Sequence, residues 1–193
     1  MFSAEPDDAE ITRWALAAGT GDRAAATAFI RATQQTVHRF LTHLVDVGEA
    51  EDLMQETYLR AMHALPRFAA RSSAKTWLLA IARRVAADHI RSVVRRPRLA
   101  AVPEWEPVAE AAQVGTDSRM EEVVVLHQLL RDLPPERREA FVATQIAGLS
   151  YAEAAQVCGC PVGTIRSRVA RARADLVAAL DANGPGARMK SAG

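Results

Sequence analysis

The sequence is poor in the residues on which catalytic and metal sites depend. Its 193 residues include two cysteines, Cys158 and Cys160, and five histidines, and no glycine-rich phosphate loop is present. A Cys-x-Cys pair without a second pair of ligands does not make a zinc site, because structural zinc needs four protein ligands. The histidines have no nucleophile or carboxylate at the spacing of a catalytic motif. We therefore expect no enzyme, no cofactor and no metal, and we interpret both cysteines as turn and packing residues.

Long apolar runs and alternating strand patterns are also missing. Alanine, leucine and arginine dominate, aromatic residues make up only 5%, and no Val/Ile/Thr run alternates with polar residues, which argues against a β-rich fold. No apolar run reaches the roughly 20 residues that span a bilayer, and the N-terminus lacks the basic head and apolar body of a signal peptide. These absences predict an all-α, cytoplasmic protein without membrane insertion.

Helical periodicity is present on both sides of one distinct segment. Residues 97–117 contain three prolines and four acidic residues with few apolar positions, which is typical of a flexible linker. With 49% hydrophobic residues overall, each flanking part can bury a core. We predict two small helical domains, 1–96 and 118–181, and a disordered tail at 182–193. Capping residues and periodicity set the expected helices at 7–18, 22–45, 49–65, 73–95, 118–131, 134–148, 150–158 and from 162 onward.

A helix-turn-helix pattern lies between residues 148 and 173. Ser150 and Glu153 form a capping box, in which each side chain satisfies a backbone N–H at the helix start. Gly159 and Pro161 end this helix, because glycine tolerates a left-handed cap and proline cannot continue a helix. The second helix then carries one apolar stripe, formed by Ile165, Val169, Ala172 and Leu176.

The opposite face of this second helix is basic and small. It consists of Gly163, Ser167, Ala170, Arg171 and Ala174, flanked by Arg166, Arg168 and Arg173. An arginine that pairs with a guanine edge provides roughly 1–3 kcal/mol of discrimination, whereas flanking arginines suit phosphates. A solvated basic face is the alternative, but the capping box, the tight turn and the stripe together favour DNA binding.

The helix expected at 49–65 has an outward face with an apolar centre. This face contains Asp52, Gln55, Glu56, Leu59, Arg60 and His63. A leucine ringed by polar groups resembles the centre of a protein interface. A single exposed leucine is also common on ordinary surfaces, so the pattern alone leaves both interpretations open.

A basic block follows, with ten Lys or Arg residues between Arg60 and Arg98 against one acid, Asp88. In the helix expected at 73–95, the face turned away from Trp77 comprises Lys75, Thr76, Leu79, Ala80, Arg83 and Ala87, below a loop with Arg71, Ser72 and Ser73. Hydroxyls and basic groups around a loop suit an unstacked base and its backbone. We interpret Trp77 as core, and Asp88 as a partly buried partner of Arg84 and Arg91.

Three ordered segments resemble the extracytoplasmic-function sigma factors of the sigma-70 family. They are Asp52-Leu-Met-Gln-Glu-Thr-Tyr-Leu-Arg-Ala, the basic segment 71–91, and Cys160-Pro-Val-Gly-Thr-Ile-Arg-Ser-Arg-Val-Ala-Arg-Ala-Arg, within a match over about residues 20–180. The resemblance implies a region 2 domain, a linker threaded through RNA polymerase, and a region 4 domain. It also implies a monomer that binds promoter DNA, the clamp of the largest subunit of bacterial core polymerase and the flap of the second largest.

The resemblance assigns three sets of site residues. The set expected to dock on the polymerase clamp is Asp52, Gln55, Glu56, Leu59 and Arg60. The set expected to melt and hold the minus-10 element is Arg71, Ser72, Ser73, Lys75, Ala80, Arg83 and Arg84. The set expected to read the minus-35 element is Thr164, Arg166, Ser167, Arg168, Ala170, Arg171 and Arg173.

Two small residues depart from what relatives carry, and other functions stay open. Ala170 stands where many relatives have a bulky residue, and Ala80 where primary sigma factors have a polar one, so the promoter sequence is undetermined. A stand-alone helix-turn-helix regulator is the main alternative, although no dimerisation helix stands out; a protein that sequesters a partner is another. Regulation by expression level, by an anti-sigma factor or by contact between the two domains is equally compatible with the sequence.

Overall fold

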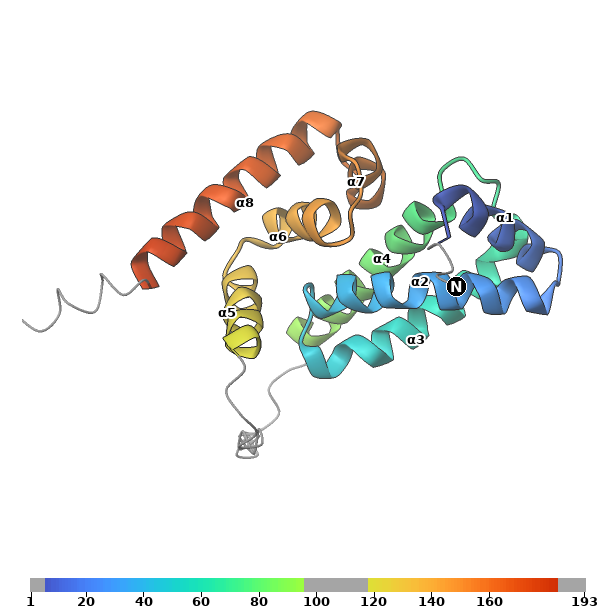
Figure 1. Cartoon of the computed structure of the whole chain (residues 1–193), viewed down its shortest axis with the longest axis horizontal. Coiled ribbons are helices and arrows are strands. Elements are labelled where there is room, and N and C mark those ends of the chain that lie inside the picture. Colours follow the sequence, from blue (N-terminus) through green and yellow to red (C-terminus); the bar gives the residue numbers. More distant parts are fainter. Residues whose placement is uncertain (1–5, 96–117, 184–193) are drawn as a thin grey trace, which may run out of the picture.

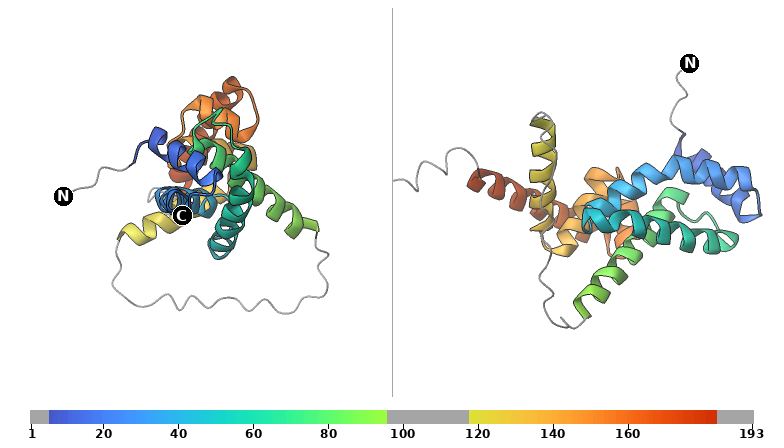
Figure 2. Two further views of the ribbon diagram at one scale, coloured as in Figure 1. Left: turned by 90° about the vertical axis from the view of Figure 1, so that its right-hand side faces the viewer. Right: turned by 90° about the horizontal axis from the view of Figure 1, so that it is seen from below.

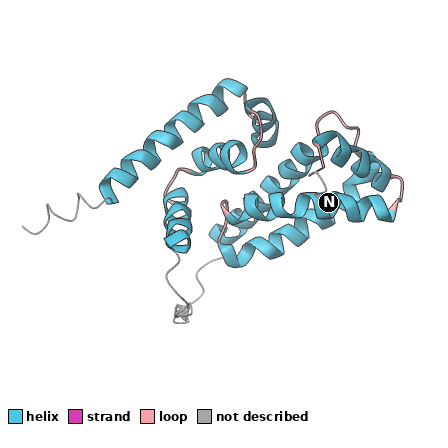
Figure 3. Cartoon of the chain, in the orientation of Figure 1, coloured by secondary structure: helices cyan, strands magenta, loops and turns pink. Residues whose placement is uncertain are grey.

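The computed structural model describes residues 6–95 and 118–183, and within these ranges all regular structure is helical (Figures 1 and 3). The all-α prediction is therefore confirmed, while the expected linker and most of the expected tail lie outside the described residues. The elements are α1 (Asp8–Gly19), α2 (Arg23–Thr42), α3 (Val47–Ala64), a 3₁₀ turn η1 (Leu65–Arg67), α4 (Ala74–Arg95), α5 (Ser118–Arg131), α6 (Pro135–Phe141), a π-helical segment η2 (Val142–Ile146), α7 (Tyr151–Cys158) and α8 (Val162–Asn183).

Side-chain caps fix several of these boundaries. The Asp22 carboxylate accepts from the N–H groups of Ala24 and Ala25 at 2.8 and 3.0 Å, and the predicted capping box of Ser150 and Glu153 is present. Gly159 ends α7 in the left-handed region with φ 65°, as a glycine cap allows. These residues satisfy helix-terminal groups within a few positions of themselves, which explains why the sequence predicted them.

The ends of two expected C-terminal helices differ from the structure. The helix expected at 134–148 changes to π-helical hydrogen bonding at Val142, and Gly148 at φ 71° turns the chain so that Leu149 enters the core with 4% of its surface exposed. Helix α8 continues through Ala182 and Asn183, two residues into the region that was expected to be a disordered tail.

Helices α1 to α4 pack as a bundle in the N-terminal half. Phe29, Phe40 and Leu41 of α2 are buried with Leu78 and Leu79 of α4. Inside the bundle, the hydroxyl oxygens of Thr33 and Tyr58 lie 2.7 Å apart, which joins α2 to α3 by a hydrogen bond. The bundle therefore gives α3 and α4 fixed outer surfaces.

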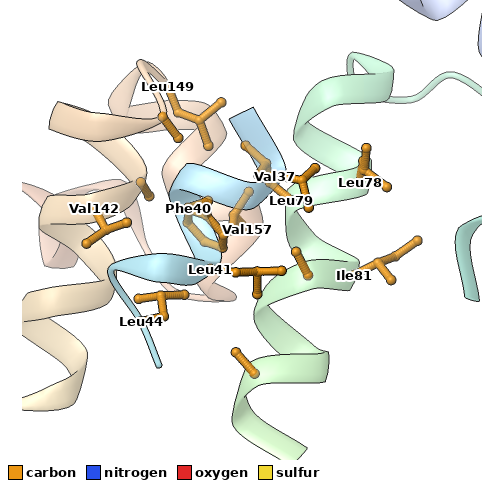
Figure 4. Close-up of a cluster of buried hydrophobic side chains, with 14 of the residues drawn as sticks. Val37, Phe40, Leu41, Leu44, Leu78, Leu79, Ile81, Val142, Leu149 and Val157 are labelled. Carbon is orange, nitrogen blue, oxygen red and sulfur yellow. The ribbon is translucent and has the colours of Figure 1, made fainter. Parts of the chain in front are cut away.

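The C-terminal half packs directly on this bundle. One cluster of buried side chains includes Phe40 and Leu79 from the bundle together with Val142 of η2, Leu149 of the following turn and Val157 of α7 (Figure 4). In Figures 1 and 2, α7 lies beside α4. Two separate domain cores were expected, and the structure instead joins them, because α7 covers an apolar stretch of α4.

A second, smaller cluster belongs to the C-terminal half alone. It ties α5 and the turn that follows it to α8 through Leu129, Leu130, Leu133, Ala172 and Leu176. The first half of α8, with Ile165 and Val169, belongs instead to the shared cluster. Helix α8 is therefore held at both ends of its apolar stripe.

Candidate functional surfaces

The α3 face is exposed as expected. It consists of Asp52, Gln55, Glu56, Leu59 and Arg60, which are all exposed except half-buried Glu56, and Leu59 is 58% exposed. Beside it, Arg60 Nε donates to Glu56 Oε1 at 2.7 Å and Arg60 Nη1 donates to Asp88 Oδ2 at 2.9 Å. The hydrogen bonds that Arg60 donates to Asp88 and Glu56 raise the pKa of its guanidinium above the ordinary value. The result is an apolar side chain next to a cation held in one orientation.

Asp88 does not have the predicted environment. Its side chain is 48% exposed, and it pairs with Arg60 and Arg91, whereas exposed Arg84 forms no ion pair among the described residues. Arg84 does lie one helical turn before Asp88. However, α3 packs against α4 and places Arg60, which is 28 residues away in the sequence, beside the Asp88 carboxylate. Hydrogen bonds from Arg60 and Arg91 hold the pKa of Asp88 below its ordinary value.

The loop–α4 surface comprises the loop Phe68–Ser73 and the adjoining first turns of α4. Ser73 Oγ accepts from Thr76 N at 3.1 Å and so acts as the expected N-cap. Ala70 has φ 49°, a left-handed conformation that costs a residue with a Cβ about 1–2 kcal/mol. Arg71 of this loop is exposed. Trp77 packs on Phe68 with ring centroids 4.8 Å apart, which agrees with its interpretation as a core residue.

The adjoining face of α4 is not turned to solvent as predicted. Thr76 is 1% exposed and Leu79 is fully buried, because α7 packs there. Arg83 Nε donates to Glu139 Oε2 of α6 at 2.8 Å, and Thr76 Oγ1 donates to Glu153 Oε1 of α7 at 3.2 Å. Of the seven candidate minus-10 residues, Arg71 and Arg84 are exposed, while Ser72, Ser73, Lys75, Ala80 and Arg83 are half-buried.

Glu153 therefore has two roles, of which the sequence indicated one. It caps α7 through the Ser150 hydroxyl and N–H, at 2.7 and 2.9 Å, and also accepts from Thr76 across the contact between the halves. Burial alone would raise the pKa of Glu153, but these hydrogen bonds hold it below its ordinary value. The carboxylate is thus charged at neutral pH beside Lys75.

The α8 face is the most accessible of the three surfaces. The apolar stripe of α8 is buried, as predicted, which leaves Arg166, Ser167, Ala170, Arg171 and Arg173 exposed and Thr164 and Arg168 half-buried.

The four arginines of this face differ in their contacts. Arg173 Nη2 donates to Gln145 Oε1 at 2.7 Å, and Arg168 Nη1 approaches Cys160 Sγ at 3.7 Å. Arg166 and Arg171 form no side-chain hydrogen bond or ion pair with any described residue. Two guanidinium groups are thus oriented by the protein, and two are available to a ligand.

The cysteines lie where packing residues are expected. Cys158 is 6% exposed, and burial raises the pKa of its thiol to about 12, so it is not a reactive thiolate. Within the part of the chain that the structure describes, no three His, Cys, Asp or Glu residues gather as metal ligands would. None of the described helices combines the length and apolar character needed to cross a membrane.

Sequence reasoning missed the side chains that reach across the molecule. No sequence pattern indicated a role for Glu139 or Gln145. In the structure Glu139 accepts from Arg83 across 56 residues, and Gln145 accepts from Arg173 across 28 residues. No local spacing rule relates such pairs, because they meet only after helices pack. Their detection required the tertiary structure.

Family models match both halves of the chain. The model described as "Sigma-70 region 2" matches residues 29–96, and "Sigma-70, region 4" matches residues 124–176. Helix α1 lies outside both matches.

Curated relatives extend the similarity over most of the chain. The chain is 53% identical over 178 residues to "ECF RNA polymerase sigma factor SigC" of Mycobacterium tuberculosis, which covers 92% of this chain and 95% of that protein. It is 32% identical over 162 residues to "ECF RNA polymerase sigma-E factor" of Escherichia coli, covering 79% of this chain and 85% of that protein.

Two solved structures share the fold over most of its length. CnrH in complex with the cytosolic domain of CnrY matches with a TM-score of 0.71 and 26% identity, covering 92% of this chain and all of that one. The sigma factor RpoE in complex with the anti-sigma factor NepR, from Bartonella quintana, matches with a TM-score of 0.65 and 28% identity, covering 82% and 98%.

Proposed function

Since the chain belongs to the extracytoplasmic-function sigma factors of the sigma-70 family, we propose that three of its surfaces divide the work of promoter-specific transcription initiation. The α3 face binds the clamp of core RNA polymerase, the loop–α4 surface melts and holds the minus-10 element, and the α8 face reads the minus-35 element. The comparisons favour this function over the stand-alone regulator.

The observation that carries the minus-35 assignment is the exposure of Arg166 and Arg171 on a rigid helix. Neither guanidinium has to leave a partner among the described residues before it binds a base or phosphate. Arg173 is already oriented by Gln145, which suits a contact that fixes register on the DNA backbone. Ala170 between them is exposed and small, so α8 can approach the floor of the major groove.

The clamp assignment rests on the make-up of the α3 face. Leu59 offers apolar area for burial, and the linked charges of Glu56, Arg60 and Asp88 form a polar rim of fixed geometry. Such a centre and rim are typical of protein interfaces. We extend the proposal to a contact between the C-terminal half and the polymerase flap, and to an anti-sigma factor, since both solved structures contain a second protein.

The minus-10 assignment has a structural consequence. Arg83 and Thr76 are bonded to Glu139 and Glu153 of the C-terminal half. A DNA strand that uses this part of α4 must replace those carboxylates with phosphates. The C-terminal half therefore has to separate from α4 before the whole loop–α4 surface is available, whereas Arg71 is accessible at once.

The first test asks whether the α3 face binds polymerase. Leu59→Asp should abolish comigration with bacterial core RNA polymerase on size exclusion, because burying an unpaired charge at an interface centre lowers affinity by 30-fold or more, on the order of 2 kcal/mol. Val47→Asp is the matched control, since Val47 lies on the same helix and is 62% exposed. Equal binding by a folded Leu59→Asp variant would contradict the assignment.

A further inference from the structure

Helix α1 lies outside the residues that the family models match, yet it contacts both ends of the loop Phe68–Ser73. It packs against η1, which precedes the loop, and against α4, which follows it. At the first end, a Cβ added to Gly19 would lie 2.7 Å from the Leu65 carbonyl oxygen. The backbones of α1 and η1 therefore approach more closely than any larger residue would allow.

At the other end, α1 supplies a hydrogen bond that α4 cannot make for itself. Ala74 N donates to Thr12 Oγ1 at 3.0 Å, across 62 residues. Ala74 provides the first N–H of α4, a group without an intrahelical partner, while Ser73 satisfies the N–H of Thr76. Thr12 Oγ1 in turn donates to the Asp8 carbonyl at 2.7 Å. The hydroxyl therefore acts as donor and acceptor together, which fixes its orientation.

A third contact holds the first lysine of α4. Lys75 Nζ lies 2.9 Å from Asp8 Oδ1, with the lysine side chain 24% exposed. Asp8 thus places a carboxylate near the N-terminus of α4, where the helix dipole favours negative charge. Asp8 and Thr12 are one turn apart on α1, so one short helical segment contacts both Ala74 and Lys75.

We infer that α1 is a brace that sets the shape of the loop Phe68–Ser73, and that Thr12 is a positioning residue for minus-10 recognition. The loop contains the left-handed Ala70, a conformation that persists where the surroundings hold it. Gly19 and Thr12 anchor the chain immediately before and after the loop, which limits the positions open to Arg71 and Ser72. This inference rests on the proposed function, since it assumes that the loop contacts the minus-10 element.

The test uses Thr12→Val, which keeps the branched shape and removes the hydroxyl. In holoenzyme with core polymerase, permanganate reactivity of minus-10 thymines should fall about fivefold, the factor that one net hydrogen bond represents. Comigration with core polymerase and affinity for a minus-35 duplex should stay unchanged, and Thr12→Ser should restore opening. The Thr12→Val variant should also distinguish less well than wild type between the original minus-10 element and elements with single-base changes, because a loosely held loop selects bases less well.

Thr27→Val is the matched control. Thr27 is exposed on α2 and donates to a carbonyl four residues earlier, as Thr12 does, but it accepts no hydrogen bond from α4 among the described residues. It should leave opening and base discrimination unchanged. If Thr12→Val lowers opening, polymerase binding and minus-35 affinity to the same extent, Thr12 is only a stability residue and the inference is overturned.

Arg71→Ala separates this inference from the assignment on which it rests. If Arg71→Ala reduces opening and Thr12→Val does not, the brace is wrong and the minus-10 assignment stands. If neither variant reduces opening, the minus-10 assignment fails and the brace fails with it. Reduced opening in both, with polymerase binding intact, supports the brace.

Discussion

The two candidate DNA surfaces of this sigma factor differ in how much the protein itself occupies them. On the α8 face, Arg166 and Arg171 have no partner among the described residues, whereas on the loop–α4 surface Lys75 pairs with Asp8 and Arg83 pairs with Glu139. A basic residue on a DNA-binding surface is therefore not automatically available to DNA. The difference arises because α8 projects its polar face away from the shared core, while α4 lies under α7.

The two surfaces differ because the two halves share one core, and a substitution in that core should have the largest effect. Leu79→Ala should lower the free energy of unfolding by about 2–5 kcal/mol, and it should accelerate hydrogen exchange in α7 as well as in α4. Leu130→Ala is the matched control, since both leucines are fully buried but Leu130 lies in the smaller cluster. Unchanged exchange in α7 of the Leu79→Ala variant would show that the halves are independent.

Arg171→Ala should have the next largest effect and tests the accessible surface. Loss of a base or phosphate contact should weaken holoenzyme binding to a minus-35 duplex by about 1–3 kcal/mol, with polymerase binding unchanged, as measured by fluorescence anisotropy. Arg31→Ala removes an exposed arginine from α2 and should have no effect. A similar loss in both variants would indicate a general charge effect instead of specific recognition.

Glu139→Gln should have a smaller effect of opposite sign on the occupied surface. Without the carboxylate, Arg83 is released, and the free protein should bind a single-stranded minus-10 oligonucleotide about two- to fivefold more tightly, as expected for a partly exposed ion pair. Glu136→Gln changes an exposed glutamate of the same helix and should have no effect. Weaker binding by Glu139→Gln would contradict the competition between Glu139 and DNA.

The smallest predicted effect is a pH dependence of the free energy of unfolding, which arises where the end of α2 meets α5. The ring of His43, which follows the end of α2, lies with its centroid 5.5 Å from that of His127 of α5, and His127 Nε2 donates to the Thr42 carbonyl at 2.6 Å. Burial, followed by the nearby His127 and Arg39, lowers the pKa of His43 below 6.5.

The unfolded chain therefore takes up a proton near pH 6.5 before the folded chain does. The free energy of unfolding should fall as pH drops below about 6.5, by less than about 1 kcal/mol in the first pH unit. In His43→Gln this dependence, measured by urea unfolding, should be shallower, whereas His38→Gln, which removes an exposed histidine of α2, should match wild type. Identical pH profiles for all three proteins would refute the assignment to His43.

Much of the fold could be predicted because its determinants are local. Ser150 with Glu153, the left-handed Gly159, and the stripe of Ile165 and Val169 act within a few residues of one another. The α3 face was also predicted correctly as exposed, since Leu59 falls opposite the buried side of a regular helix. The roles of these residues in binding polymerase and DNA stay predictions.

The errors concern residues whose environment depends on a distant element. Thr76 and Leu79 were placed on an outward face of α4 because the periodicity of α4 cannot reveal that α7 covers that face. Asp88 was given Arg84 as a partner because helical spacing cannot reveal Arg60 on α3. In each case the competing contact comes from tertiary packing, which overrides an inference from one helix alone.

By itself, then, the sequence determined the helices, their caps, the helix-turn-helix and the basic character of two surfaces, because hydrogen bonding and periodicity within one helix suffice for these. Only the tertiary structure decided which basic residues are occupied, since Arg83 meets Glu139 across 56 residues and Ala74 meets Thr12 across 62. Such pairs form as a result of helix packing, which sums many weak apolar contacts over the whole chain.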